Sequence, residues 1–393
     1  MSFPSKVKFE WLNSWEEVWN PTFLEQWQKL IDLDPDAHVF FSPSVVRAWV
    51  ETQLAFRLIK PRFLIGRQDH KLMLLFPLVL EREGWQGGWV RSLEPAGWNA
   101  FDYQNPIMSA PWADHENDVL LADILEKCRA AIGREYDVLR IPFLRASSLT
   151  RSESLPQVDE APFLDLAEVE SLDQITVKLS KGWRQDIGRQ RRRLEKLGPV
   201  EMLTCGPNEG ERAKGLFQKL MLFHSERWGY QRNEPAKRRI MTLWRNLATH
   251  ALPSKLLHVS AIRCGDEVIA CSLSFQFNNR FYFYIPASSL KWANYSPGKV
   301  HLAMLLEQAI ASRIQVFDFL RGNESYKQQW THMSVPLYRV EERVDGIGPI
   351  LRTNLQQSVA RLRAAAKTVV VRSRSILTPS KLVVRHVKGE KQP

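Results

Sequence analysis

The chain has 393 residues, which is too long for a single hydrophobic core, so at least two domains are expected. Its hydrophobic content of 44% and charged content of 25% are ordinary for a globular protein. The net charge of +11 is concentrated at one end: residues 351–393 hold ten Lys or Arg and one acid, which leaves +2 for the body. This distribution argues against a nucleic-acid groove in the body.

The sequence shows no sign of membrane insertion, secretion or metal binding. No apolar run approaches the ~20 residues of a membrane span, and Met1–Glu10 lacks the apolar core of a signal peptide. The cysteines are scattered without metal-ligand spacing, so we expect a reducing compartment, no disulfide framework and no metal site. The cytoplasm is the expected location. The four cysteines are Cys128, Cys205, Cys264 and Cys271.

The first half of the chain predicts a mixture of strands and helices. Runs of β-branched and aromatic residues predict strands, and apolar residues three and four positions apart predict helices. Strands or extended segments are expected at Val7–Trp11, Arg62–Ile65, Leu72–Leu80, Phe101–Met108 and Asp137–Ile141. Helices are expected at Pro21–Ile31, Ser44–Phe56 and Glu116–Ile132.

The second half repeats this order of elements. Helices come first, then a three-stranded meander, then one more helix and a last strand. We interpret this pattern as an internal duplication of a meander–helix–strand unit. The helices are expected at Leu179–Leu197, Glu209–Trp228, Ala236–Thr249 and Ser296–Ala311. The strands are expected at Leu256–Arg263, Glu267–Phe277, Phe281–Ile285 and Val316–Leu320.

The turn before the last helix has the features of a phosphate site. Ser296 is predicted to cap the helix, and Pro297 occupies its first position. Gly298 has no side chain to block the helix amides, and Lys299 adds a positive charge to the helix dipole. Ser-Pro-Gly is also a common helix start with no ligand. The equivalent first-half turn, at residues 110–115, has no glycine and carries an acid, so only the second half is expected to bind phosphate.

Two motifs together resemble a known family. The turn Tyr295–Lys299 and the stretch Phe317–Trp330 (FDFLRGNESYKQQW) are similar to the CelD-like branch of the GNAT N-acyltransferases, which is linked to cellulose or other exopolysaccharide biosynthesis. The resemblance covers about residues 160–340, and the doubled architecture of Fem-type peptidyltransferases extends it to the first half. It implies an α/β (α+β) fold with two tandem GNAT-like lobes, each a mixed sheet flanked by helices. The expected parts are a degenerate lobe at 1–160, an acetyltransferase lobe at 161–345 and a basic helical or flexible tail at 346–393.

The resemblance also implies a cofactor and its place. Acetyl-CoA, or another acyl-CoA, would be held through its pyrophosphate by the turn, and its pantetheine arm would lie between splayed strands ending at Ile285 and Leu320. No metal is implied. The turn departs from the usual GNAT pattern, which is richer in Arg and Gly, so it offers fewer donors. The expected cofactor-binding residues are Tyr295, Ser296, Gly298 and Lys299.

Three residues after the turn are candidate catalysts. Asp318, among apolar strand neighbours, suits a general base for an amine; alternatively it pairs structurally with Arg321 or Lys327. Glu324 is the second candidate base. The resemblance implies that Tyr326 protonates the leaving thiolate; alternatively it only packs. The expected substrate-binding residues are Arg321, Lys327 and Trp330.

Two basic segments have several interpretations. The helix at Lys181–Lys196 carries an apolar stripe, so the favoured interpretation is that its arginines form a solvated face. The second is a basic rim that attracts an anionic acceptor or the CoA 3′-phosphate, and the third is RNA binding. In the tail, Leu351–Val371 has helical apolar spacing with basic neighbours. That segment could dock on the body, lie on an anionic membrane surface or extend into solvent.

The resulting functional prediction is an acyltransferase. An acyl group, expected to be acetyl, moves from CoA to an amine or hydroxyl of a small molecule, a sugar or an envelope or exopolysaccharide precursor. The alternatives are a Fem-like transferase that uses aminoacyl-tRNA and a catalytically silent scaffold for polysaccharide assembly. No specific nucleic acid is expected, and the tail is expected to allow peripheral contact with the inner membrane face. The sequence does not indicate an oligomeric state.

Overall fold

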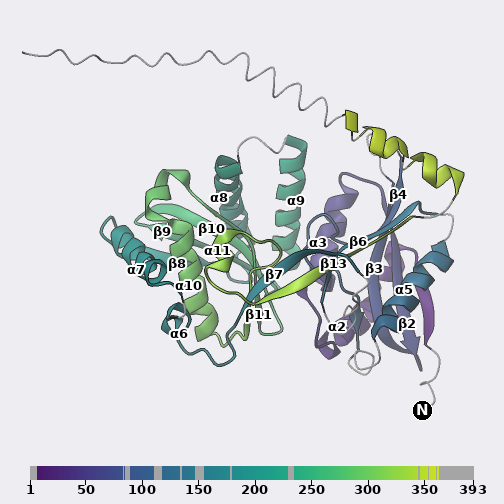
Figure 1. The fold of residues 1–393 in the computed structure, drawn as a ribbon, viewed down its shortest axis with the longest axis horizontal. Helices are drawn as coiled ribbons and strands as arrows, with labels where there is room; N and C mark the ends of the chain where they lie inside the picture. Colours follow the sequence, from purple (N-terminus) through teal and green to yellow (C-terminus); the bar gives the residue numbers. More distant parts are fainter. Residues whose placement is uncertain are drawn as a thin grey trace, which may run out of the picture.

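The computed structural model describes residues 7–82, 84, 89–109, 117–132, 135–146, 155–177, 179–228, 234–343, 346–352, 354–359 and 361–362. Within these residues the chain forms two α/β lobes that lie side by side (Figure 1). One mixed sheet of 13 described strands runs through both lobes. This arrangement agrees with the predicted fold class.

The N-terminal lobe begins with a strand and helices and continues with a meander. Its second helix starts where the Asn20 side chain accepts hydrogen bonds from Thr22 N and Phe23 N, with Pro21 at the first position. The strands are β1 (Lys8–Leu12), β2 (Ile59–Gln68), β3 (Lys71–Arg82), β4 (Arg91–Pro95), β5 (Ile107–Met108) and β6 (Val138–Arg145). The helices are α1 (Trp15–Val18), α2 (Pro21–Leu33), η1 (Val39–Phe41), α3 (Pro43–Leu54) and α5 (Asn117–Ile132).

The C-terminal lobe follows the same plan with additional helices before its first meander strand. Its meander and last long helix lie where the sequence predicted them. The strands are β7 (Gln157–Asp165), β8 (Val200–Thr204), β9 (Leu257–Cys264), β10 (Glu267–Phe277), β11 (Arg280–Ser288), β12 (Val316–Asp318) and β13 (Ser334–Arg343). The helices are α6 (Leu172–Thr176), α7 (Lys181–Glu195), α8 (Gly210–Trp228), α9 (Glu234–His250), η4 (Leu290–Tyr295), α10 (Pro297–Ala311) and α11 (Ser325–Gln328).

The two lobes are related by an internal repeat that exchanges one strand. The order β1-β2-β3-β4-β6 in the first lobe matches β8-β9-β10-β11-β12 in the second, and the last two strands of each set are parallel. The next strand then crosses over: β7 pairs with β12, β13 pairs with β6, and the two pair with each other in the middle. Neither β7 nor β13 was predicted. The expected boundary between residues 160 and 161 falls inside β7.

The sheet of the C-terminal lobe is covered on both faces. Phe281 and Phe283 of β11 pack in a core with α10, α6 and α7. Tyr282 points to the opposite face, where α8 and α9 lie, because side chains alternate along a strand. That second core continues into the N-terminal lobe: α3 packs on α9, and the Phe40 and Tyr282 ring centroids are 5.9 Å apart. The lobes therefore share one apolar core.

Candidate functional site

A wedge opens between β11 and β12. The two strands pair in parallel only from Arg280–Val316 to Tyr282–Asp318, while β11 continues along β10 to Ser288. After Asp318 the chain turns away through Leu320, whose φ of 61° is left-handed. It then follows β7: Phe319 N donates to Pro162 O (2.9 Å) and Gly322 N to Glu160 O (3.0 Å). Beyond Tyr282, β11 therefore has no partner strand on this side among the described residues.

The corresponding wedge of the N-terminal lobe, between β4 and β6, is filled by the chain itself. Gln104 N donates to Phe143 O at 3.0 Å. The Asn105 amide both donates to and accepts from the Arg145 backbone at 2.8 Å. These bonds occupy the edge of β6 that an extended ligand would need. The predicted turn near residues 110–115 lies outside the described residues.

The helix α10 starts at the wedge, but its first turn differs from the prediction. Pro297 is the first helical residue, as expected. Ser296, however, has a left-handed φ of 48° and its side chain caps nothing. Its carbonyl accepts from Lys299 N (3.0 Å) and Val300 N (3.3 Å). Because Ser296 makes no cap hydrogen bond in this conformation, the predicted side-chain cap is wrong. Within the described part of the chain, Gly298 N is the first-turn amide without an acceptor.

Lys299 is not a free cation. Its ammonium forms an ion pair with Asp186 of α7 and lies 3.5 Å from the centroid of the Trp183 ring. The hydrogen bond from Lys299 is the main reason that the pKa of Asp186 falls to about 2. Tyr295 also contacts α7, because the Arg193 guanidinium lies 4.7 Å from its ring centroid. The turn thus faces α7, and a bound phosphate would share Lys299 with a carboxylate.

Asp318 is buried in a network that joins the lobes. One carboxylate oxygen accepts from the Tyr103 hydroxyl and from Leu320 N, both at 2.8 Å, and the other accepts from Arg280 at 3.0 Å. Burial raises the pKa of Tyr103 well above its ordinary value, so the phenol stays protonated and donates. The structural alternative for Asp318 therefore has the better support, but its partner is Arg280 and not Arg321 or Lys327.

The loop after Asp318 is held together by Lys327. This buried ammonium donates to the carbonyls of Leu320 (3.2 Å), Arg321 (2.7 Å) and Gly322 (3.4 Å), and it lies 2.8 Å from the Glu324 carboxylate. These contacts are all internal. The structure therefore gives Lys327 a role in shaping the loop, and none of these contacts supports the predicted binding of substrate. They also tie the candidate base Glu324 to the same loop.

Tyr326 and Trp330 lie on the α10 side of the sheet, in its core. Burial raises the pKa of Tyr326 above its ordinary value, so the phenol carries its proton at neutral pH. Trp330 and Trp183 line a cavity of about 1180 Å³ between β7, α6, α7 and the chain after α11. Its described lining includes Asp165 and Glu168 but no Lys or Arg, so the cavity itself does not favour phosphate.

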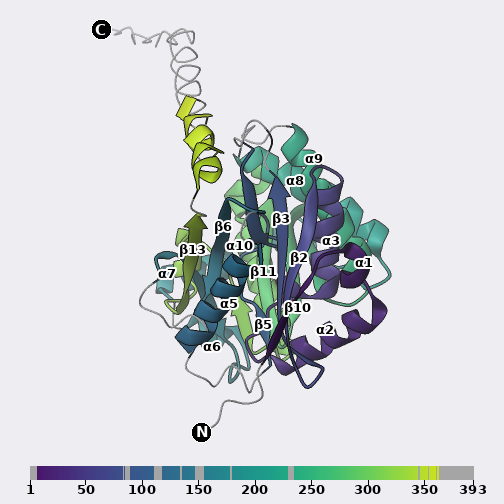
Figure 2. The same ribbon diagram turned by 90° about the vertical axis from the view of Figure 1, so that its right-hand side faces the viewer.

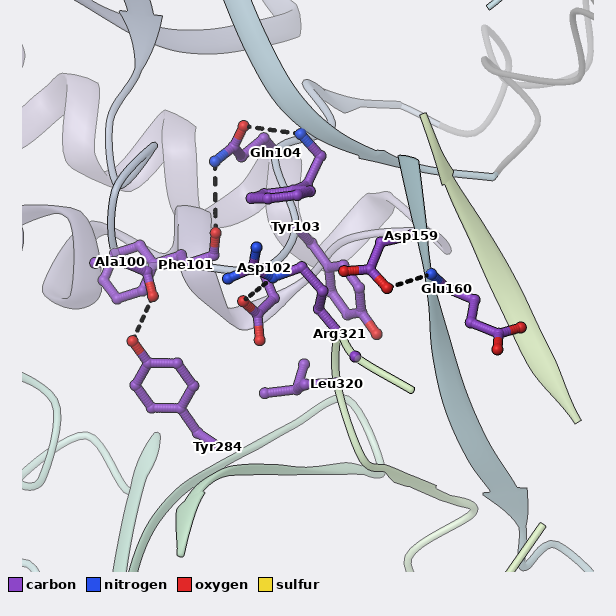
Figure 3. Close-up of polar contacts among 12 residues, drawn as sticks. Ala100, Phe101, Asp102, Tyr103, Gln104, Asp159, Glu160, Tyr284, Leu320 and Arg321 are labelled. Carbon is purple, nitrogen blue, oxygen red and sulfur yellow. Dashed lines mark hydrogen bonds and ion pairs between the residues drawn. The ribbon is translucent and has the colours of Figure 1, made fainter. Parts of the chain in front are cut away.

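A carboxylate from the N-terminal lobe reaches the wedge. Asp102 accepts a hydrogen bond of 3.2 Å from Arg321, which stacks on Phe143 at 4.0 Å from the ring centroid. Burial raises the pKa of Asp102 to about 6, partly offset by Arg321 and Lys327. Figure 3 shows this pair, with Tyr284 of the other wedge arm donating to Ala100 O. Asp102 therefore lies against the wedge arm that contains Arg321.

Sequence reasoning did not single out Asp102. It lies in the segment Phe101–Met108, which was expected to be extended, and only β5 at its end is a strand. An acid between two aromatic residues in such a segment was the one available signal. Of the predicted site residues, Arg321 alone lies in this interlobe pair. The turn Tyr295–Lys299 and the residues Tyr326 and Trp330 lie on the α10 side, with Asp318 buried between.

The comparisons with known proteins agree with this geometry. Residues 181–328 match the family model described as an acetyltransferase (GNAT) domain, a span of less than half the chain. The C-terminal lobe matches the GNAT acyltransferases. The wedge, α10 and the loop around Lys327 all lie inside this GNAT match. A comparison with curated protein sequences finds no match.

Solved structures show the same fold across both lobes. The FemX structure matches with a TM-score of 0.56 at 9% identity, covering 82% of this chain and 94% of that one. L-PGS from Bacillus licheniformis matches with a TM-score of 0.51 at 11% identity, covering 86% and 96%. Because both matches span most of each chain, both lobes have counterparts, and the predicted tandem GNAT-like fold is confirmed. At these identities the likeness shows the fold alone.

Two further findings concern metals and membranes. No group of three or more His, Cys, Asp or Glu side chains in the described part of the chain could hold a metal ion. Among the same residues, no helix is both long and apolar enough to cross a membrane.

Proposed function

We propose that this protein transfers an acyl group, preferentially acetyl, from acyl-CoA to an amine or hydroxyl acceptor. One observation carries the proposal. The repeat places the same wedge in both lobes, yet the N-terminal wedge is filled by Gln104 and Asn105, and the wedge within the GNAT match is left without a partner strand. A lobe that kept an open β edge beside a helix N-terminus is suited to an extended ligand that carries phosphate.

The donor would bind from the α10 face. Its thioester arm would lie along the unpaired edge of β11. Its pyrophosphate would contact Gly298 N, Lys299 and the Ser296 hydroxyl, which makes no cap hydrogen bond. The tryptophan walls of the cavity suit the uncharged parts of such a donor. Trp183 connects the two regions, because it lines the cavity and contacts Lys299.

The acceptor would approach from the N-terminal lobe. Asp102 would act as the general base, because a carboxylate with a pKa of about 6 is ionised at neutral pH and still basic enough to take a proton. The amine or hydroxyl attacks the thioester carbonyl, its proton passes to Asp102, the carbon–sulfur bond breaks, and the released CoA thiolate takes a proton from solvent, because the raised pKa of Tyr326 makes its phenol a weaker acid than a thiol. Arg321, whose side chain is 40% exposed, would orient the acceptor. The CelD-like resemblance favours an amino sugar or an envelope or exopolysaccharide precursor.

Calorimetric titration with acetyl-CoA tests the donor site. The wild type should bind, and Gly298→Asp should weaken binding by roughly tenfold or more, because its carboxylate would oppose the pyrophosphate. Gly298→Ala is the matched control, since a Cβ there meets only the Ser288 side chain, with Oγ at 3.4 Å and Cβ at 3.8 Å. Failure of the wild type to bind acetyl-CoA and longer acyl-CoAs would remove the proposal. If Gly298→Asp binds acetyl-CoA as tightly as the wild type does, only the proposed position of the pyrophosphate would be wrong.

Release of CoA thiol then tests the reaction. Wild-type protein, acetyl-CoA and a panel of amines, amino sugars and hydroxylated sugars are mixed, and thiol release above hydrolysis identifies the acceptor class. All four cysteines of the protein are buried, so they contribute little to the thiol signal. Binding without turnover on any acceptor would favour a scaffold.

Aminoacyl transfer from charged tRNA is the second candidate. The observation in its favour is the row of exposed basic side chains on α7, beside the start of α10. A charge-neutralising variant, Arg184→Gln with Arg192→Gln, should then lose tRNA affinity and flatten its salt dependence. Absence of tRNA binding at low salt by the wild type would eliminate this candidate. The basic residues are Lys181, Arg184, Arg192 and Lys196.

A further inference from the structure

A helical segment follows β13 and is held against the N-terminal lobe. Residues 347–352, 354–359 and 361–362 are helical. The Arg352 guanidinium donates to both oxygens of Asp137 at 2.8 and 2.5 Å, and Arg140 donates to Gln356 at 3.2 Å. Asp137 is fully buried, which would raise its pKa, but its hydrogen bonds from Arg352 and Arg91 hold the pKa well below the ordinary range. The carboxylate is therefore charged, and it fixes the rotation of the helix.

That rotation leaves an apolar stripe facing solvent. Ile347, Leu351, Leu355 and Leu362 recur at intervals of four, four and seven residues, which places them on one helix face. Their exposed fractions are 81%, 63%, 41% and 71%. Figure 2 shows the segment standing out beyond the end of β13. A stripe of this kind is exceptional on a helix that is already anchored to the body through its neighbouring face.

Charge identifies what covers the stripe. Residues 351–393 contain ten Lys or Arg and one acid, whereas the rest of the chain has a net charge of +2. A second copy of the chain would bring a like charge of the same size to the contact, which disfavours self-association. An anionic bilayer can bury the leucines at its headgroup–acyl boundary, and its negative headgroups attract the basic residues.

We infer that the helical segment formed by residues 347–352, 354–359 and 361–362 lies in the interface of a membrane rich in anionic phospholipid and attaches the protein to it. The leucine stripe enters the headgroup–acyl boundary, and the exposed Arg361 contacts headgroups while Arg352 stays paired with Asp137. Asp137 lies next to the first residue of β6, and Arg145 at the opposite end of that strand is the residue that holds Asn105. Attachment at the Asp137 end therefore leaves the wedge and Asp102 away from the bilayer.

Vesicle sedimentation of the full-length protein tests this attachment. The vesicles are phosphatidylcholine with or without phosphatidylglycerol. The wild type should sediment with the anionic vesicles only. The variant Leu351→Gln, Leu355→Gln, Leu362→Gln should lower the partition coefficient by about tenfold or more, because three apolar side chains no longer enter the boundary.

A matched triple variant provides the control. Leu33, Leu58 and Leu197 are similarly exposed, at 62%, 76% and 55%, and their change to Gln should leave sedimentation unchanged. Thermal unfolding checks that all three proteins are folded. The inference is overturned if the wild type ignores anionic vesicles, if the stripe variant sediments like the control, or if both vesicle types bind equally. It is also overturned if the stripe variant instead abolishes self-association measured by light scattering.

Discussion

At the scale of single residues, the carboxylates near the wedge divide into two kinds. Asp318 has its oxygens occupied by Arg280, Tyr103 and Leu320 N. Asp102 has one described partner, the half-exposed Arg321, and burial raises its pKa to about 6. Asp318, whose two oxygens both accept hydrogen bonds, is suited to joining the two lobes. Asp102, whose pKa is raised and which lies beside the wedge, is suited to proton transfer. Changes at the two positions should therefore have opposite effects.

Asp102→Asn should lower kcat/KM by roughly 10²–10⁴-fold and leave acetyl-CoA affinity unchanged, since it removes the base and not the donor site. The wild-type profile of kcat/KM against pH should rise with a pKa of about 6, and this limb should disappear in the variant. Rates of thiol release across pH give both quantities. An unchanged profile in the variant would assign the base to another residue.

The same substitution has a predictable effect on stability. Because burial raises the pKa of Asp102, the folded state holds this proton more tightly than the unfolded chain does. Its contribution to stability is thus complete below the ordinary carboxyl pKa of about 4 and is lost as the pH rises through about 6. Asn resembles the protonated acid, so the variant should unfold at an equal or higher temperature than the wild type at neutral pH. A marked loss of stability would instead indicate a structural role.

Asp318→Ala should destabilise the fold by roughly 3–5 kcal/mol, because it leaves the largely buried Arg280 without its counter-charge. Tyr103→Phe, which removes one hydrogen bond and keeps the ring, should cost only about 1 kcal/mol. Urea unfolding measures both. An Asp318→Ala protein of wild-type stability and no activity would restore the original hypothesis that Asp318 is the general base.

At the scale of elements, local patterns predicted those parts of the fold that local chemistry determines. The meander β9–β11 and the start of α10 at Pro297 follow from alternation, helical spacing and proline. The strands β7 and β13 were missed because their stability comes from partners in the other lobe, and their sequences combine proline with charged residues. The left-handed Ser296 and the burial of Lys299 against α7 likewise depend on tertiary contacts. The start of α10 beside the wedge was therefore predicted from local sequence, but the ion pairs around it were not.

The segment Phe101–Asn105 fills the wedge of the N-terminal lobe, whereas the corresponding wedge of the C-terminal lobe has no partner strand among the described residues. Asn105→Ala should remove both side-chain bonds to Arg145 and destabilise the protein by roughly 1–3 kcal/mol. Because the segment also carries Asp102, kcat should fall by more than acetyl-CoA affinity does. Gln157→Ala, at an exposed amide with one bond of 3.5 Å, is the control and should change neither. Equal loss of kcat and affinity would show that the segment supports the donor site instead.

At the scale of the whole molecule, exchange of β7 and β13 makes the two lobes one folding unit. The strand β7 follows β6 of the N-terminal lobe along the chain but pairs with β12 of the C-terminal lobe, and β13 follows β12 but pairs with β6. The helices α3 and α9 pack together in a core that both lobes share. Unfolding of the full chain should therefore occur in a single transition when followed by circular dichroism and by tryptophan fluorescence. Two separated transitions would contradict this coupling.

Truncation tests the same coupling at the predicted domain boundary. A chain of residues 161–362 begins inside β7 and loses the first four residues of that strand, and it also lacks β6, the partner of β13. The residues of β7 that pair with β12 remain in this fragment, but most of β13 would have no partner strand, and an unpaired edge favours aggregation. This fragment should be insoluble or unfolded, whereas residues 1–362 should unfold at the temperature of the full chain. A soluble, cooperatively folded 161–362 fragment that binds acetyl-CoA would show that the GNAT match can be independent, with the first lobe needed only to supply Asp102.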